Sequence, residues 1–168
     1  MKAAFYKGTR PGWQGLYSRA ARFIDRGPYS HCELIFSDGM SASASYIDGG
    51  VRLKRIDYDA EHWDIVDLAG FDEPAARAWF EERAGEGYDL WGNLRFIFGW
   101  VRDDDGRWFC SEALMAALGF HGPWRFGPNG AAAAIKRWCS DITNQPAQAG
   151  FFMPDGDAQA EICRKETP

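Results

Sequence analysis

Cys110 is the residue with the clearest setting for chemistry. The apolar pattern of residues 110–118, closed by Gly119, predicts a helix that begins at this cysteine. Unpaired backbone amides at a helix N-terminus stabilise a thiolate and can donate to an oxyanion during acyl transfer. The pattern therefore favours Cys110 as a nucleophile; the alternative is a small buried core residue.

Three histidines, His31, His62 and His121, are the candidate bases for such a thiolate. Alternation over residues 30–36 predicts a strand that would hold His31 rigidly, with Glu33 on its face and Cys32 on the opposite face. The other two histidines fall in predicted exposed loops. The pattern favours His31 as the base, although a strand histidine can also be purely structural.

Two other kinds of site are disfavoured by spacing. The chain has no Cys-x-x-Cys or His-x-x-x-His pair, and His31 and Cys32 would point to opposite faces of a strand. Ser111 does not lie in a Gly-x-Ser-x-Gly elbow, so a serine nucleophile is also disfavoured. We expect neither a metal nor another cofactor.

The elements that must position these side chains begin with strands and end with helices. Turn signals at 37–39 and 48–50 join three predicted strands into an antiparallel meander. Residues 88–98 are expected to be helical or looped. The predicted strands cover residues 3–6, 30–36, 41–47, 51–56 and 63–68, and the predicted helices cover 16–24, 75–84, 110–118 and 131–138. We expect an α+β fold whose antiparallel sheet packs against helices, including the cysteine-bearing one.

Length and composition indicate one folded domain. A chain of 168 residues with 46% hydrophobic content can bury a continuous core, which we expect over residues 1–143, followed by a loosely packed tail over 144–168. The net charge of -5 and the even spread of basic residues disfavour a nucleic-acid partner. The aromatic-rich segment 90–101 is too short to cross a membrane.

The cysteines and the first residues bear on the compartment. The start of the chain has no apolar run long enough for a secretory signal, so we expect a cytoplasmic protein. Four widely separated cysteines are then expected to be free thiols: Cys32, Cys110, Cys139 and Cys163.

Several short motifs together resemble a known family. Residues 30–33 (Ser-His-Cys-Glu) precede residues 109–112 (Phe-Cys-Ser-Glu), with Gly-Gly-Val at 49–51 and Gly-Tyr-Asp at 87–89 between them. This order is similar to the permuted branch of the NlpC/P60 superfamily, the YiiX/YaeF-like papain-like amidases of bacteria and their phages. The resemblance covers residues 10–130 and implies a permuted papain-like fold.

The resemblance also implies roles for individual residues. Cys110 would attack an acyl carbon, and His31 would accept the thiol proton and return it to the leaving group, through a thioacyl-enzyme that water resolves. Tyr88 matches a tyrosine that would orient substrate or oxyanion; the alternative is a packed aromatic residue. The expected activity is that of a cysteine amidase, peptidase or lipid-acyl hydrolase.

The third catalytic residue departs from the family pattern. It is often supplied by the strand after the histidine strand, but residues 41–45 here are Ser-Ala-Ser-Ala-Ser. Ser43 or Ser45 would serve weakly, and Glu33 would serve if the strand geometry allows. This departure motivates one alternative, a binding module with an impaired site. A cell-wall peptide hydrolase is a further alternative.

The resemblance leaves the acyl substrate open. It is compatible with a small acyl compound, a peptide or a lipid amide. The apolar residues of 90–101 would form a wall for a fatty acyl chain or belong to the core.

Overall fold

The computed structural model describes residues 1–8, 19, 22, 25–89 and 106–144. Over these residues the protein is a mixed α+β structure built on one seven-stranded sheet. The strands are β1 (Lys2–Tyr6), β2 (His31–Ile35), β3 (Ser41–Ser45), β4 (Gly50–Lys54), β5 (Trp63–Asp67), β6 (Gly87–Tyr88) and β7 (Arg107–Trp108). The α-helices of the described part are α2 (Glu73–Glu82), α3 (Cys110–Ala117) and α4 (Pro128–Asn144), with a short 3-10 turn at Pro123–Arg125.

The sheet has the strand order β5-β1-β2-β3-β4-β6-β7. Strands β2, β3 and β4 form the predicted antiparallel meander, and β1 lies between β2 and β5, antiparallel to both. The five strands predicted from alternation and turn residues are therefore confirmed, with ends that differ by a few residues. Alternation predicts them well because side chains on a strand point to opposite faces with a period of two.

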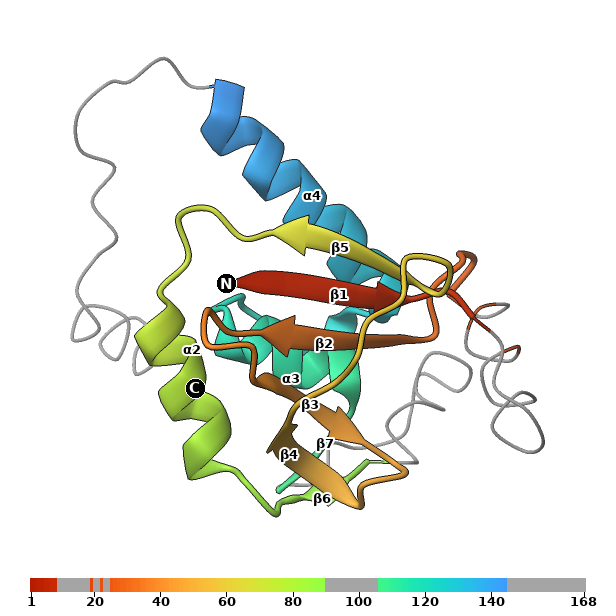
Figure 1. Cartoon of the computed structure of the whole chain (residues 1–168), viewed down its shortest axis with the longest axis vertical. Coiled ribbons are helices and arrows are strands. Elements are labelled where there is room, and N and C mark those ends of the chain that lie inside the picture. The colour runs from red at the N-terminus through yellow and green to blue at the C-terminus, as the bar shows by residue number, and fades with distance from the viewer. Residues whose placement is uncertain (9–18, 20–21, 23–24, 90–105, 145–168) are drawn as a thin grey trace, which may run out of the picture.

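One face of the sheet forms the hydrophobic core. Helix α3 lies behind β2 in Figure 1, packs on β2 and β3, and contacts both α2 and α4. Alternate strand residues face this core, and all are nearly inaccessible to solvent: Ala3, Phe5, Cys32, Leu34, Ala42, Ala44 and Val51. The two alanines of β3 matter because small side chains let the helix approach the sheet closely.

The opposite face carries polar side chains under a crossing segment. Residues 55–62 connect β4 to β5 and pass in front of the sheet in Figure 1. The Tyr58 hydroxyl in this segment donates to the Ser41 hydroxyl at 2.8 Å. Residues on this face are therefore buried without belonging to the core around α3.

The far edge of the sheet corrects one expectation. The sequence predicts a helix or loop over residues 88–98, but Tyr88 lies in strand β6, whose other residue, Gly87, pairs with Gly50 on β4. A Cβ at Gly50, whose φ is +151°, would lie 1.9 Å from the Glu86 carbonyl oxygen. A two-residue strand has no alternation to read, so this pairing arises from tertiary contact. Residues 90–105 lie outside the described residues.

The helices also differ from expectation in their ends. The 75–84 and 110–118 predictions are confirmed by α2 and α3, and Gly119 follows α3 with φ +77°, which suits glycine. Helix α4 continues beyond the predicted end at Trp138 to Asn144, and an Arg137–Asp141 ion pair of 2.9 Å one turn apart supports the extension. The predicted helix 16–24 falls largely, and the tail after Asn144 entirely, outside the described residues.

No helix in the described part of the chain is long and apolar enough to cross a membrane.

Candidate active site

The candidate site forms where a strand and a helix both begin. His31 is the first residue of β2 and Cys110 is the first residue of α3. Strand β2 pairs with β3 through Leu34 and Ile35, at the end of β2 away from His31. The imidazole and the thiol are close enough to interact by charge and by a hydrogen bond, as their mutual effects on ionisation show.

Glu33 is the partner of His31. The His31 Nε2 atom lies 2.8 Å from the Glu33 Oε1 atom, and the Glu33 side chain is only 1% exposed. An ionised carboxylate can only accept, so Nε2 carries the proton of this hydrogen bond. That assignment leaves Nδ1 as the ring nitrogen for Cys110.

Arg52, a residue that the sequence analysis did not single out, completes the group around Glu33. Its guanidinium donates from Nη1 to Glu33 Oε2 at 2.7 Å and from Nη2 to Oε1 at 2.5 Å. Its Nε atom donates to Asp48 at 2.8 Å, and Lys54 donates to both oxygens of Asp48 at 2.7 Å. His31, Glu33, Arg52, Asp48 and Lys54 therefore form a chain of alternating charge, which we call the charge chain.

Small side chains on β3 allow this chain to cross the sheet. Ser43 pairs with Arg52 in the β3–β4 register, and extending the β2–β3 register by one residue sets Glu33 beside Ser43. A serine between them leaves room for the long arginine side chain to lie over β3. The repeated Ser-Ala pattern of β3 thus serves both faces: alanines under α3, and serines beside the charge chain.

Electrostatics favour a separated charge pair in the site. A hydrogen bond from the Cys32 thiol is the largest effect that lowers the pKa of Cys110. Burial raises this pKa and the charge of His31 lowers it further, so that it lies well below the ordinary value. Burial disfavours charge on His31, but Cys110 and Glu33 together raise the pKa of His31 to about 9. These shifts favour a Cys110 thiolate facing a His31 imidazolium at neutral pH.

The neighbouring acids and thiols keep complementary states. Burial alone would raise the pKa of Glu33, but hydrogen bonds from Arg52 and His31 outweigh it and lower the pKa below its usual range. Burial, reinforced by Cys110, raises the pKa of Cys32 well above that of an ordinary thiol. Cys32 thus remains a protonated donor, and Glu33 remains an ionised acceptor.

The start of α3 supplies backbone donors beside the thiol. The first bond within the helix runs from the Ala113 amide to the Phe109 carbonyl at 3.0 Å, and Phe109 at the N-cap provides no side-chain cap. The amides of residues 110–112 therefore precede the hydrogen-bond ladder of the helix. Such amides stabilise a thiolate and can bind an oxyanion at the same position.

An aromatic cluster flanks the imidazole. The Trp63 ring lies edge-on to His31 with centroids 6.4 Å apart, and it also packs edge-on against Tyr58 at 4.9 Å. Burial, followed by the charge of Glu33, raises the pKa of Tyr58, so its hydroxyl stays protonated. These rings thus lie beside the His31–Glu33 pair.

Helix α4 holds the strand that carries His31. The Asn129 side chain accepts from the Tyr29 amide at 2.9 Å and donates to the Tyr29 carbonyl at 2.9 Å, two residues before His31. The backbone amide of Asn129 also donates to Asp25 at 2.6 Å, and its side-chain amide donates to the same carboxylate at 2.8 Å. A two-point bond to the backbone fixes where β2 begins, a contact between residues far apart in the sequence.

The other residues considered in the sequence analysis lie elsewhere or make other contacts. Ser43 donates to the Cys32 carbonyl at 2.8 Å and to the Ala44 carbonyl at 3.2 Å, so the third-residue position beside His31 is held by Glu33 instead. Tyr88 is half-buried and packs edge-on against Tyr46, with centroids 5.9 Å apart. His62 binds Asp59 at 2.7 Å in the segment before β5, and His121 is exposed after α3.

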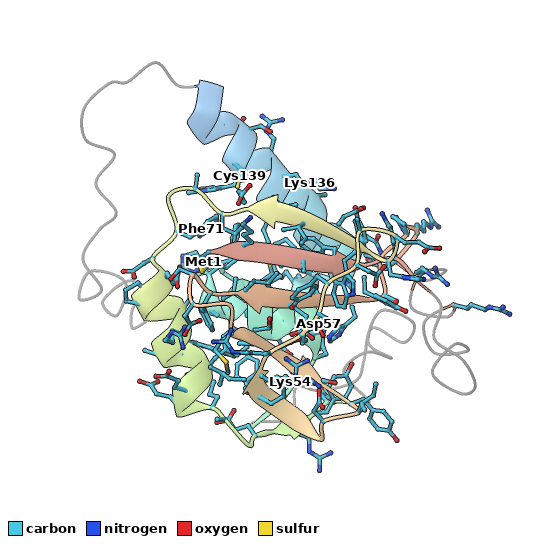
Figure 2. The ribbon with its side chains drawn as sticks, viewed as in Figure 1. Met1, Lys54, Asp57, Phe71, Lys136 and Cys139 are labelled. Carbon is cyan, nitrogen blue, oxygen red and sulfur yellow. The ribbon has the colours of Figure 1, made fainter. Side chains whose placement is uncertain are left out.

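The remaining cysteines are separate from this group. Cys139 lies on α4 (Figure 2), where its thiol donates to the Asp67 carbonyl at 3.4 Å. Cys163 lies outside the described residues. In the described part of the chain Cys32, Cys110 and Cys139 are free thiols, and the first two are buried.

No model of a known protein family matches the chain, and no curated protein matches it either.

Proposed function

We propose that the chain is a cysteine hydrolase with a permuted papain-like fold, which acts on an ester or amide through a thioacyl-enzyme. The observation that carries this proposal is the array of Cys110, His31 and Glu33, in which a thiol of lowered pKa meets an imidazole of raised pKa held by a carboxylate. A purely structural cysteine in an apolar core has its pKa raised by burial instead.

The proposed chemistry follows from these charge states. The Cys110 thiolate attacks the carbonyl carbon of the substrate, and backbone amides at the start of α3 receive the oxyanion. The His31 imidazolium then gives its proton to the leaving amine or alcohol, and the acyl group stays on sulfur. A water molecule next gives a proton to His31 and attacks the thioester, which releases the acid and restores the thiolate. Glu33 holds the ring with Nδ1 toward the sulfur.

A catalytically impaired binding module is the alternative from another class. Its motivation was the lack of a carboxylate or amide on β3, and the Glu33 contact to His31 at 2.8 Å removes that motivation. Both a peptide and a lipid amide can supply the acyl group in the proposed chemistry. The site residues described above do not distinguish these substrates.

An activated ester tests the proposal without knowledge of the natural substrate. We expect p-nitrophenyl acetate to give a burst of p-nitrophenolate equal to the enzyme concentration, with the acetyl group found on Cys110 by peptide mass spectrometry. The burst should be absent in Cys110→Ser and retained in Cys139→Ser, the matched control at a half-exposed thiol. If the folded protein is acetylated at other thiols while Cys110 stays unmodified, the proposed hydrolase is excluded. Acylation without later hydrolysis would favour the impaired module.

A further inference from the structure

We propose that Arg52 is a positioning residue of this site: it holds the Glu33 carboxylate ionised and in place against His31, so that the imidazole keeps the proton taken from Cys110. This inference rests on the proposed function, because it assigns a role in preparing the same nucleophile. Arg52 contacts neither the thiol nor the imidazole through a hydrogen bond of its own in the described structure; it acts through Glu33.

The geometry at Glu33 is fully determined by its partners. Oε1 accepts from both His31 Nε2 at 2.8 Å and Arg52 Nη2 at 2.5 Å, while Oε2 accepts from Arg52 Nη1 at 2.7 Å. A bidentate pair fixes the plane of the carboxylate as well as its position. The oxygen that faces His31 is therefore set by the guanidinium and does not depend on the His31 bond alone.

The need for a cation follows from burial. The Glu33 side chain is 1% exposed and that of Arg52 is 13% exposed. A buried carboxylate without a counter-ion takes up a proton near neutral pH, because desolvation penalises its charged form. Among the described residues, the charged and titratable groups that interact with Glu33 include His31, Arg52, Tyr58 and the Cys32 thiol. Of these, only the guanidinium is permanently positive.

Arg52 is itself held from its other side. Its Nε atom donates to Asp48, which lies in the turn between β3 and β4 and also binds Lys54, so all three guanidinium nitrogens are used. A lysine at this position would keep the charge but lose the planar three-point geometry. Arg52→Lys therefore separates the role of charge from the role of orientation.

The test measures the ionisation of Cys110 directly. Wild type, Arg52→Gln, Arg52→Lys and the matched control Arg77→Gln are alkylated with iodoacetamide between pH 4 and 9, and the rate at Cys110 is read by peptide mass spectrometry. Arg77 is a suitable control because it forms a comparable ion pair, 2.8 Å from Asp38, away from the site. Cys139 in each sample serves as an internal reference, and circular dichroism checks folding.

The expected result is a shift in the acid limb of the rate profile. Arg52→Gln should move its midpoint upward by about one pH unit or more, because a neutralised Glu33 stabilises the imidazolium less. Arg52→Lys should shift it by a smaller amount, and Arg77→Gln should not shift it. If Arg52→Gln does not fold, Arg52→Lys decides: an upward shift supports the proposal.

The contrary outcomes are distinct. A folded Arg52→Gln variant with the wild-type midpoint would show that Glu33 needs no such support. Where only Arg52→Lys folds, a wild-type midpoint in that variant would show the same. A downward shift would show that Glu33 stays ionised without Arg52, which also overturns the proposal. Failure of the proposed function is recognised separately, from the wild-type protein alone. Cys110 would then react like an ordinary thiol, with a midpoint at about pH 8.5.

Discussion

The Glu33 carboxylate binds His31 at 2.8 Å and binds Arg52 with both of its oxygens. Two residues of strand β2 therefore form a pair that is anchored by an arginine of strand β4. His31 and Glu33 share a face of β2 because they are two residues apart. The pair is largely buried, with Trp63 and Tyr58 beside it, and burial strengthens its electrostatic interactions. The predictions below follow from this pair and from the elements that hold it.

Neutralising Glu33 should slow the reaction of Cys110. Glu33→Gln keeps the shape of the side chain but removes its charge, so the His31 imidazolium is less stable and the thiolate forms at higher pH. We expect acylation of Cys110 at pH 6 to slow by about tenfold or more, since a nearby opposite charge changes a pKa by one to three units. The burst with p-nitrophenyl acetate measures this rate.

Asp38→Asn provides the matched control for that substitution. Asp38 is a carboxylate that pairs with Arg77 outside the site, so its neutralisation should leave the acylation rate at the wild-type value. Equal rates in wild type and Glu33→Gln would contradict a role for the carboxylate. A thermal melt shows whether the variant is folded at the assay temperature.

The thiolate and the imidazolium should make opposite contributions to the pH dependence of stability. The pKa of His31 is raised from 6.5 to about 9, so its contribution is fully present below pH 6.5 and is lost as the pH rises through 9. The pKa of Cys110 is lowered, so its contribution is present above the ordinary thiol pKa and is lost as the pH falls. Between pH 6.5 and 9 the two changes offset each other.

Cys110→Ser should expose the histidine contribution alone. We expect Glu33, against the opposing effect of burial, to keep the pKa of His31 raised in this variant, although less than in wild type. The free energy of unfolding should then fall as the pH rises above 6.5. Urea denaturation at several pH values between 6 and 9 measures the difference. A variant whose stability changes with pH just as wild type does would argue against the ion pair.

Removing the Asn129 side chain should destabilise the protein. Asn129→Ala breaks bonds to the amide and carbonyl of Tyr29 and to Asp25, and it leaves buried backbone groups without those partners. We expect a loss of about 1–3 kcal/mol in the free energy of unfolding. Ser140→Ala is the control on the same helix, where an exposed hydroxyl bonds to the Lys136 carbonyl, and it should change stability by less than about 0.5 kcal/mol.

The same variant should also affect the site. Since Asn129 fixes the backbone two residues before His31, its loss should reduce acylation of Cys110 even under conditions where the protein remains folded. An acylation rate unchanged from wild type would show that the start of β2 is held by its other contacts.

Enlarging a core alanine on β3 should disturb α3. Ala44 is fully buried beneath the helix, and Ala44→Leu adds volume where the sheet and α3 are in contact. Overpacking of this kind costs about 1–3 kcal/mol. Ala60→Leu makes the same change at an exposed position and should leave the melting temperature close to that of wild type. Equal melting temperatures for the two variants would contradict close packing of α3 on β3.

The local elements of the site could be predicted from the sequence. Alternation identified β2, the helical pattern ending at Gly119 identified α3, and both predicted starting points, near His31 and at Cys110, agree with the structure. The prediction that Glu33 shares a face with His31 follows from the same period of two. The short strand β6 at Tyr88 and the edge strand β7 were missed because two residues carry no periodic signal.

The partners that hold the site were not predictable in the same way. A basic residue alternating with apolar ones, as Arg52 does in 51–56, indicates a solvated strand face when only the sequence is considered. Its burial follows from the segment 55–62 that crosses the sheet and from the serine that separates it from Glu33. Asn129 likewise stands at the start of a helix with no local sign of a distant backbone partner.

The sequence by itself thus determined the five longer strands, the helix that begins at Cys110 and the face shared by His31 and Glu33, because backbone periodicity and turn chemistry act over a few residues. Tertiary structure alone decided which cation meets Glu33, which thiol donates to Cys110 and which helix holds the start of β2. Those contacts depend on strand register and on the packing of distant segments, so the charge state of the site is a property of the folded chain.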